Sequence, residues 1–222
     1  DLANRGVLVT LIMGPSSVKT DNVLIERINV ISAQEMYEAV HANINNQDYA
    51  IFSAAVADYK PAIPAHQKIK KSSETLTLEL VKNPDILASV GAMESHPFLV
   101  GFALETENEM EHAFAKAKKK NTDLLILNSM NDNGAGFGID TNKITIIDNQ
   151  GNAQEFPVKS KTLVAKDIVD EIVNDIINNA VLSDTVNTIV NDIINNAVDI
   201  VAARNSSCVP CAESLNHDDG DD

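Results

Sequence analysis

The alternation of apolar, β-rich segments with helical segments along residues 1–160 constrains the fold more than any other feature of this sequence. Strands alternating with helices form βαβ units and a largely parallel sheet. The last two strands, which flank Asn149-Gln150-Gly151, are expected to pair antiparallel. The pattern therefore predicts an α/β fold: a Rossmann-like three-layer domain with a mostly parallel sheet and a small antiparallel extension. We expect the strands at residues 7–13, 26–31, 49–53, 76–81, 98–103, 123–128, 143–148 and 153–157.

Local signals set the expected helix boundaries. Ser32-Ala33-Gln34-Glu35 and Thr106-Glu107-Asn108-Glu109 have the form of capping boxes, so helices are predicted to run from them to about Asn43 and Lys120. Asn83-Pro84-Asp85 predicts a short helix with proline at its first position. A long helix is expected to start near Ser160.

The six residues before the first predicted strand look like the end of a helix. Asp1–Gly6 (DLANRG) is polar, and Gly6 suits a left-handed C-cap. A doubly wound domain usually opens with a strand, a glycine-rich phosphate turn and then such a helix. We therefore expect the sequence to begin inside its first βαβ unit.

The negative charge lies mainly in the C-terminal part. Of the net charge of −15, residues 167–222 carry 12 Asp and Glu and one Arg, a net of −11, which leaves −4 for residues 1–166. The string IVNDIINNAV occurs at 172–181 and again at 189–198 with apolar residues at helical spacing, which predicts two amphipathic helices. The expected domains are thus 1–172, a helical extension at 173–205, and an acidic disordered tail at 206–222.

Composition excludes several classes of protein. A hydrophobic fraction of 44% can supply a core, and no apolar run approaches the roughly 18 residues of a membrane span. The opening residues do not resemble a signal peptide. Two cysteines can form at most one disulfide, which is too few to stabilise a chain of this size. We expect a cytoplasmic protein with no membrane partner. An acidic chain without a broad basic stripe is also expected to bind no nucleic acid.

Four polar loops are predicted at the carboxyl ends of the parallel strands, where ligands collect in such sheets. They are residues 54–60, 82–86, 101–106 and 128–138. Asp58, in the first loop, could accept hydrogen bonds from an exocyclic amine; a turn aspartate capping its own backbone is an equally good interpretation. Lys68-Ile69-Lys70-Lys71 suits a mobile flap over phosphates, or a solvated charge run.

The other candidates also have two interpretations. The helix start at Asn83–Ile86 could attract a phosphate, or the same residues could be ordinary capping. Phe102 could stack on a base or belong to the core. Lys116 and Lys120 share a helical face and could hold a triphosphate, or they could neutralise a helix C-terminus. Cys208-Val209-Pro210-Cys211 lacks a second ligand pair, so a zinc or redox role is not favoured. No metal ligands can be assigned.

The order and spacing of these motifs resemble the phosphopantothenate–cysteine ligase family. The resemblance covers about residues 1–172 and rests on the following strings: AAVADYK at 54–60, KIKK at 68–71, KNPDI at 82–86, GFALET at 101–106, Lys116 and Lys120, and GAGFGIDTNKITII at 134–147.

The resemblance implies an enzyme of coenzyme A biosynthesis that joins cysteine to 4′-phosphopantothenate with CTP, through an acyl-cytidylate, in the presence of Mg²⁺. It assigns Asp58 to cytosine, Lys68 to catalysis and residues 69–74 to a flap. It implies a homodimer and, in bacteria, an associated decarboxylase domain or chain. The remaining assignments are the CTP pocket and triphosphate (Asn83, Pro84, Asp85, Ile86, Phe102, Lys116, Lys120) and the substrate site (Ala54, Ala55, Val56).

Two features depart from the family pattern. Its opening strand and glycine-rich turn have no counterpart in this sequence, and the part beyond about residue 172 matches nothing in the family. The alternative is a non-catalytic or incomplete nucleotide-binding fragment whose acidic helical tail serves assembly. We expect the isolated chain to bind CTP but to form little phosphopantothenoylcysteine. A nicotinamide oxidoreductase is disfavoured because there is no GxGxxG dinucleotide fingerprint.

Overall fold

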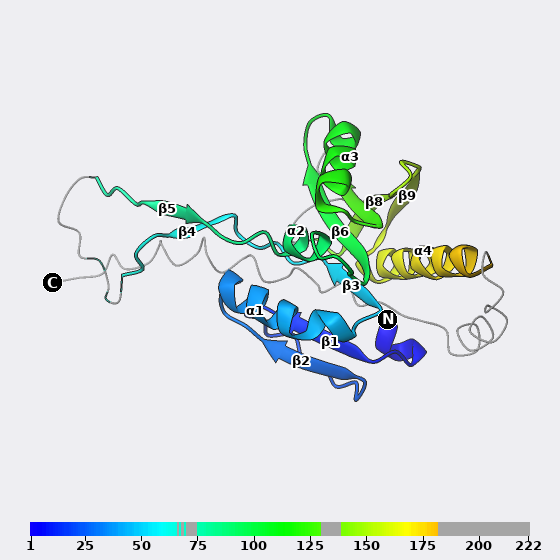
Figure 1. The fold of residues 1–222 in the computed structure, drawn as a ribbon, viewed down its shortest axis with the longest axis horizontal. Helices are drawn as coiled ribbons and strands as arrows, with labels where there is room; N and C mark the ends of the chain where they lie inside the picture. The colour runs from blue at the N-terminus through cyan, green and yellow to red at the C-terminus, as the bar shows by residue number, and fades with distance from the viewer. Residues whose placement is uncertain (66, 68, 70–74, 130–138, 182–222) are drawn as a thin grey trace.

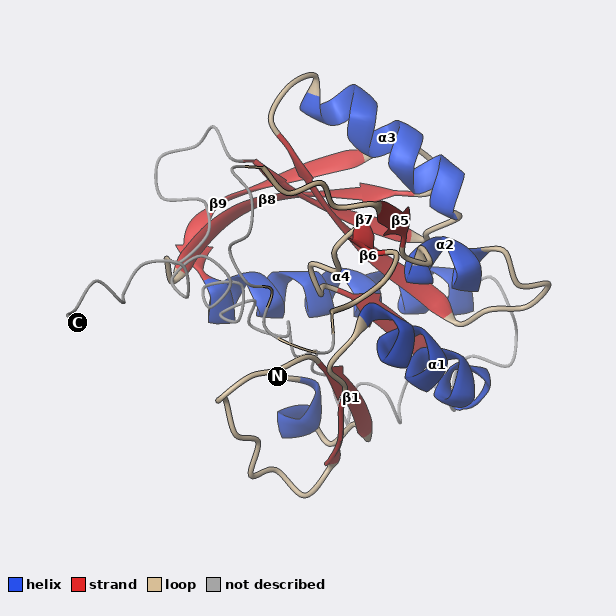
Figure 2. Cartoon of the chain, turned by 90° about the vertical axis from the view of Figure 1, so that its left-hand side faces the viewer, coloured by secondary structure: helices blue, strands red, loops and turns tan. Residues whose placement is uncertain are grey.

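The computed structural model describes residues 1–65, 67, 69, 75–129 and 139–181, apart from the side chains of Ser129 and of 175–181. A five-stranded mixed sheet forms its centre (Figures 1 and 2). The first three strands are parallel, and the last two add to them as an antiparallel extension. The order across the sheet is β3 (Tyr49–Phe52), β6 (Phe98–Glu105), β7 (Leu124–Ser129), β8 (Thr141–Asp148) and β9 (Ala153–Ser160).

Helices cover both faces of this sheet, which confirms the three-layer prediction (Figure 2). On one face lie α1 (Ala33–Asn43), α2 (Ile86–Gly91) and α3 (Glu109–Lys120); on the other lies α4 (Lys161–Val181). The apolar residues of β6 and β7 contribute alternately to the two sides. Val100 and Ile126 pack with α4, whereas Leu125 and Leu127 pack with α3. This alternation follows from the two-residue period of a strand.

A second strand pair lies beside the main sheet. Strands β1 (Val9–Met13) and β2 (Ile25–Asn29) are parallel and in register from Val9↔Ile25 to Met13↔Asn29. The 3-10 turn η1 (Leu2–Arg5) precedes them, and Gly6 follows it with φ of 93°. The predicted helix end with a left-handed glycine is therefore confirmed, as a 3-10 turn.

Strands β4 (Tyr59–Pro61) and β5 (Leu80–Lys82) form an antiparallel arm that extends away from the sheets (Figure 1). The predicted strand at 76–81 is wrong in length, because only its last residues and Lys82 pair. Leu76 and Leu78 are 64% and 58% exposed. Without a core to cover their alternating side chains, the hydrophobic pattern alone does not hold these residues in a sheet.

The predicted helix start at Ser32 is confirmed, with a variant of the capping box in which Glu35 binds the residue before the N-cap. Ser32 Oγ accepts from the Glu35 amide at 3.1 Å, and the Glu35 carboxylate accepts from the Ile31 amide at 2.8 Å. The second predicted capping box is wrong, since α3 starts after Asn108, which has φ of 45° and makes no side-chain cap bond. Pro84 is not the first residue of its helix either: Asp85 is the N-cap of α2, so Pro84 precedes the cap.

The predicted long helix starts at Lys161 and continues through the first copy of the repeated string. Ile172 in that helix is fully buried in the cluster beneath the sheet. The second copy, at 189–198, and the acidic tail at 206–222 lie outside the described residues. Among the helices that are described, none is long and apolar enough to cross a membrane.

Glu171 in α4 gives the stability of this fold a specific pH dependence. Burial, Asp170 and Asp167 raise its pKa, because each of them disfavours the charged carboxylate. The folded state then binds the proton more readily than the unfolded state, so stability falls as pH rises from the ordinary value through the raised one. We expect Glu171→Gln to raise the Tm slightly at pH 7 and to lose this advantage below about pH 4, where both states are protonated.

Thermal unfolding at pH 7 and pH 4 checks this, with exposed Glu94→Gln as the matched control. A Glu171→Gln protein that is less stable than the parent at pH 7, or equally stabilised at both pH values, would contradict the assignment.

Candidate functional site

Two of the polar loops predicted at the ligand-binding edge, residues 54–60 and 82–86, meet at the base of the arm. The chain leaves β3, passes through residues 53–57 without regular structure, and enters β4 at Tyr59. Of the predicted substrate-binding residues in this loop, Ala54 and Ala55 are exposed and Val56 is half-buried. Asp58, also exposed, stands at the start of the arm. The loop therefore presents backbone and one carboxylate to solvent beside the carboxyl end of a parallel strand.

Asn83 connects this loop to the start of α2. Its backbone N–H donates to the Asp58 carbonyl at 2.8 Å, and its Nδ2 donates to the Ala57 carbonyl at 2.8 Å. These two bonds use both kinds of Asn83 donor and fix the orientation of its amide. Its Oδ1 is buried and has no hydrogen-bond partner among the described residues. A buried acceptor without a partner is costly, so this oxygen is a candidate contact for a ligand N–H or O–H.

Asp85 has two local partners. One carboxylate oxygen accepts from the Ala88 amide at 3.1 Å, and the other lies 3.2 Å from Lys120 Nζ. The capping interpretation thus describes Asp85 in this structure, because its own carboxylate occupies the helix end where a phosphate was expected. Pro84 is half-buried and Ile86 is buried, so neither offers a polar group to a ligand.

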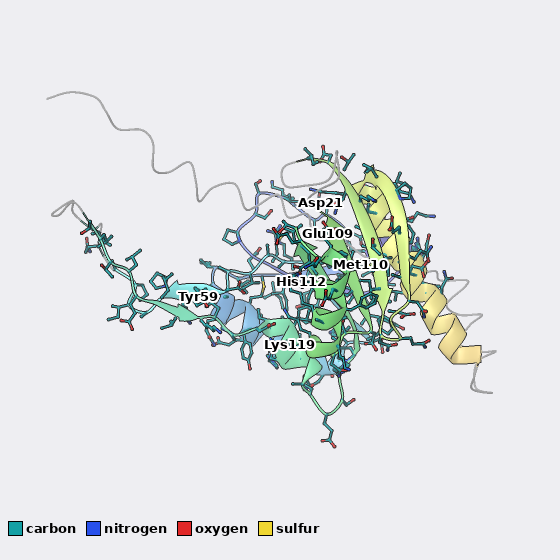
Figure 3. The ribbon with its side chains drawn as sticks, turned by 90° about the horizontal axis from the view of Figure 1, so that it is seen from above. Asp21, Tyr59, Glu109, Met110, His112 and Lys119 are labelled. Atoms are coloured by element: carbon teal, nitrogen blue, oxygen red, sulfur yellow. The ribbon has the colours of Figure 1, made fainter. Side chains whose placement is uncertain are left out.

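Lys116 and Lys120 project from α3, and each is matched by a carboxylate. Lys116 Nζ makes an ion pair with Glu105, which ends β6 and is 13% exposed in its side chain. The contact is an ion pair without aligned hydrogen-bond geometry, since Glu105 Oε1 has no hydrogen-bond partner among the described residues. His112 Nδ1 lies 3.6 Å from the other oxygen of Glu105. In Figure 3, His112 marks this end of α3 and Tyr59 marks the arm.

A row of polar groups therefore runs from the Asp58 loop through Asn83, Asp85 and Lys120 to Lys116 and Glu105. Phe102 is not part of it. The Phe102 side chain packs against the cluster of Val100, Ile126 and α4 residues, on the opposite face of the sheet from α3. The proposed catalytic Lys68 lies outside the described residues; so do residues 70–74 of the predicted flap and residues 130–138 of the fourth loop.

Sequence reasoning did not assign a role to Glu105 or His112. The sequence contained a signal for each residue. Glu105 lies in the GFALET string, and His112 is four residues from Lys116, on the same face of one helix. Their convergence depends on how α3 packs on β6, which the sequence pattern does not specify.

Comparisons with known proteins relate the whole described body to one family. Residues 1–176 match the family described as the DNA/pantothenate metabolism flavoprotein C-terminal domain. The chain is 47% identical over 170 residues to the coenzyme A biosynthesis bifunctional protein CoaBC of Vibrio vulnificus strain CMCP6, covering 75% of this chain and 42% of that protein. It is 44% identical over 172 residues to a cysteine/cysteine sulfinic acid decarboxylase from an unknown prokaryote, covering 77% and 48%.

A solved structure of the same kind of domain also resembles this chain. The C-terminal domain of a coenzyme A biosynthesis bifunctional protein CoaBC superposes with a TM-score of 0.63 at 34% identity, covering 77% of each chain. The chain spans less than half the length of the two curated relatives, at 48% and 42%. The similarity therefore concerns one part of those proteins.

Proposed function

Because this chain belongs to the DNA/pantothenate metabolism flavoprotein C-terminal domain family, we propose that it is a phosphopantothenate–cysteine ligase domain of coenzyme A biosynthesis. In this proposal it joins cysteine to 4′-phosphopantothenate and uses CTP as the activating nucleotide. The observation that carries the proposal is the polar row that joins the Asp58 loop and Asn83 to the two lysines of α3. It combines acceptors suited to a base with cations suited to phosphates.

The proposed reaction has two steps. A carboxylate oxygen of 4′-phosphopantothenate attacks the α-phosphorus of CTP, forming a P–O bond and breaking the bond to the β-phosphate, so that pyrophosphate leaves. The cysteine amine then attacks the acyl carbon; the C–N bond forms, CMP leaves and the amine loses a proton. Both steps depend on positioning and on neutralising phosphate charge, and neither requires a protein nucleophile.

The acceptors would select the base. The Asp58 carboxylate would accept from the cytosine amine, and the buried Asn83 Oδ1 would accept a further hydrogen bond from the nucleotide. Ala54, Ala55 and Val56 would line the neighbouring path of the substrate with backbone groups. Phe102 and Ile86 face the core in this structure, so a role for them in the CTP pocket would be to support its wall.

The lysines would bind the triphosphate by exchanging partners. Lys116 is paired with Glu105 and Lys120 with Asp85, and an incoming polyanion would compete with those carboxylates. The Lys120–Asp85 pair lies near the surface, where an ion pair contributes about 0–1 kcal/mol, whereas charge-assisted bonds to phosphate are stronger. Release of Lys120 toward phosphate is therefore energetically accessible. Release of Lys116 would cost more, because the largely buried Glu105 carboxylate would lose its counter-ion. The carboxylates would keep both side chains extended along one face of α3 before the nucleotide arrives.

Mg²⁺ fits this site as an ion that comes with the nucleotide. The described residues contain no group of three His, Cys, Asp or Glu side chains able to hold a metal by themselves. Magnesium usually needs only one or two carboxylates besides phosphate oxygens, and Asp85 and Glu105 are the carboxylates next to the lysines. When bound, the ion would neutralise part of the phosphate charge.

The proposal includes a homodimer in the cytoplasm, associated with a decarboxylase domain or chain. Apolar side chains on the arm support an interface between copies: Tyr59, Leu76, Leu78 and Leu80 are all at least half exposed. Large exposed apolar groups on a projecting element are typical of contact surfaces.

The direct test of the function joins the chain to the segment that precedes the matched region in the Vibrio vulnificus relative. It supplies CTP, 4′-phosphopantothenate, cysteine and Mg²⁺ and measures pyrophosphate, CMP and phosphopantothenoylcysteine. We expect the three products to form together and pyrophosphate formation to require the phosphopantothenate carboxylate. Pyrophosphate release that does not depend on phosphopantothenate, or no binding of CTP at all, would refute the proposal.

The choice of nucleotide gives a sharper prediction. Asp58→Ala is expected to weaken CTP binding far more than UTP binding, because uracil has no exocyclic amine for the carboxylate. Loss of one charged hydrogen bond corresponds to about 1.5–3 kcal/mol, roughly 10- to 150-fold in Kd. Isothermal calorimetry with both nucleotides measures the effect, with the exposed Glu94→Ala as control. Equal weakening of CTP and UTP would remove Asp58 from the base site.

A further inference from the structure

Glu105 places a largely buried carboxylate at the end of the sheet where ligands collect. It is the last residue of β6, and its side chain is 13% exposed. Its Oε1 is buried and has no hydrogen-bond partner among the described residues. Asp85, the other carboxylate beside the lysines, is 52% exposed and caps α2. Glu105 is therefore the acidic group of this site that depends more on a partner, because a buried charge is costly when it is unpaired.

The position of Glu105 relates it to the predicted substrate loop. Strands β3 and β6 are parallel neighbours and pair through Phe52↔Gly101. Four residues further along each segment, Val56 stands in the loop after β3 and Glu105 stands at the end of β6. The ion pair with Lys116 of α3 shows that the Glu105 side chain lies on the α3 face of the sheet. Glu105 thus lies at the same end of the sheet as the substrate loop and on the same face as the two lysines.

Nucleotide binding would leave this carboxylate without its main counter-ion. When Lys116 turns to the triphosphate, the charge of Glu105 stays in a largely dehydrated position, which is unfavourable unless another cation takes the vacated place. His112 does not take that place. Its Nδ1 lies 3.6 Å from the other carboxylate oxygen while Lys116 is still present, and its side chain is 51% exposed. The replacement must then be a cation that arrives with CTP or after it.

Two cations of the proposed reaction meet this condition, Mg²⁺ and the ammonium group of cysteine. Mg²⁺ is held mainly by phosphate oxygens and needs only one or two carboxylates, and the exposed Asp85 can supply one. The ammonium group is the closer match, because it carries its charge and three N–H donors on one nitrogen, as the lysine Nζ does. The Lys116–Glu105 pair therefore represents, with a lysine, the contact that a primary amine substrate would make.

We propose that Glu105 binds the amino group of cysteine, at a place that becomes free when CTP draws Lys116 away. This inference rests on the proposed function and assigns Glu105 to its second step. The ammonium binds to the carboxylate and loses one proton to water. The amine then attacks the acyl carbon with its lone pair, the bond to CMP breaks, and the second proton leaves the nitrogen to water. While the C–N bond forms, the nitrogen becomes positively charged, and the carboxylate stabilises that charge.

Glu105→Gln separates the two steps, because glutamine keeps the shape of glutamate and removes its charge. The variant is made in the protein of the direct test, the chain joined to the preceding segment of the relative. We expect kcat/KM for cysteine to fall by about 10- to 100-fold, the effect of one charge-assisted hydrogen bond. Phosphopantothenate-dependent release of pyrophosphate without cysteine should be unchanged. CTP should bind at least as tightly as to the parent, because Lys116 no longer has to leave a carboxylate.

Two variants and one second substrate serve as controls. Lys116→Gln should show the opposite pattern, with weaker CTP binding and a nearly unchanged kcat/KM for cysteine at saturating CTP. Glu105→Asp keeps the charge and should recover part of the activity with cysteine. Cysteamine has the amino group of cysteine without its carboxylate, so Glu105→Gln should reduce its kcat/KM by the same factor. In the unmodified protein, calorimetry should show cysteine binding at least about 10-fold more tightly with CTP than without it.

Several results would overturn the inference. Weaker CTP binding by Glu105→Gln with an unchanged kcat/KM for cysteine would leave Glu105 as a support for Lys116. A raised Mg²⁺ requirement in the first step would make it a metal ligand instead. Equal binding of cysteine with and without CTP would also contradict it, and this measurement needs no variant that folds. In all three cases the proposed function stands. A parent protein without phosphopantothenate-dependent pyrophosphate release would refute the proposed function, and the inference with it.

Discussion

Replacement of Lys68 by glutamine is expected to reduce the rate of phosphopantothenoylcysteine formation by about 100-fold or more, with the fold unchanged. The physical reason is that both steps of the proposed reaction develop negative charge on phosphate and acyl oxygens. Removal of one positioned donor at such a centre typically reduces turnover by roughly 10²–10³-fold. Glutamine keeps most of the length of lysine and removes the charge, so the effect should appear in kcat, whereas CTP affinity should change little.

The KIKK string contains its own controls. Lys70→Gln and Lys71→Gln remove the same charge within three residues of Lys68 in the same sequence context. If Lys68 has a specific role, these two variants should lose far less activity than Lys68→Gln, because they leave the Lys68 ammonium in place. Similar losses in all three variants would indicate a general electrostatic effect of the segment, and near-normal activity of Lys68→Gln would leave KIKK as a solvated charge run. Thermal unfolding of each variant establishes that the fold is intact.

The parts of the fold that the sequence predicts best are those in which one physical effect dominates. Most of β6 and β7, residues 98–104 and 124–127, are continuous apolar runs, as expected of strands that are buried on both faces. Ser32 and Glu35 start α1 through local hydrogen bonds, and Gly6 ends η1 through its backbone freedom. In each case the determining interaction lies within a few residues of the chain.

The predictions that failed depend on tertiary context. The alternation of Leu76, Leu78 and Leu80 is that of a half-buried strand, but only Leu80 finds a pairing partner, in Pro61. Thr106 was predicted to cap α3, yet β6 continues through Glu105 and the helix starts only after Asn108. A strand extended by pairing with its neighbour therefore overrode a local capping signal.

The site shows the same division. Asn83, Asp85, Lys116 and Lys120 could be identified from residue type and position. Their pairings could not, because Lys120–Asp85 and Lys116–Glu105 join α3 to α2 and to β6. Phe102 illustrates a real ambiguity of sequence analysis. Strand alternation places it on one of two faces, and the choice of the α4 face depends on which helix covers each side of the sheet.

The α2–α3 contact that aligns Asp85 with Lys120 depends on a glycine, and its substitution is expected to have the largest effect on stability. A Cβ added at Gly91 would lie 2.0 Å from the Lys120 carbonyl oxygen and 3.0 Å from its carbonyl carbon. These are backbone atoms, so no side-chain rotation relieves the overlap, and α2 would have to move away from the end of α3. The Asn121 side chain, which donates to the Gly91 carbonyl at 3.0 Å, would be displaced as well.

Gly91→Ala should therefore destabilise the protein by about 3 kcal/mol, the upper range for overpacking, which corresponds to a fall in Tm of roughly 6–12 °C for a domain of this size. Gly14→Ala is the matched control, because nothing lies within 4 Å of its added Cβ. It should stay within about 0.5 kcal/mol of the parent. Each variant adds one methyl group to the parent, so the difference between their stabilities in thermal or urea unfolding isolates the contact with Lys120.

The same pair of variants can be compared in CTP binding. If the folded Gly91→Ala protein also loses CTP affinity while Gly14→Ala does not, the spacing of α2 and α3 sets the position of the Lys120 side chain as well as the stability of the fold. A Gly91→Ala protein as stable as Gly14→Ala would show that α2 and α3 are not held at this separation.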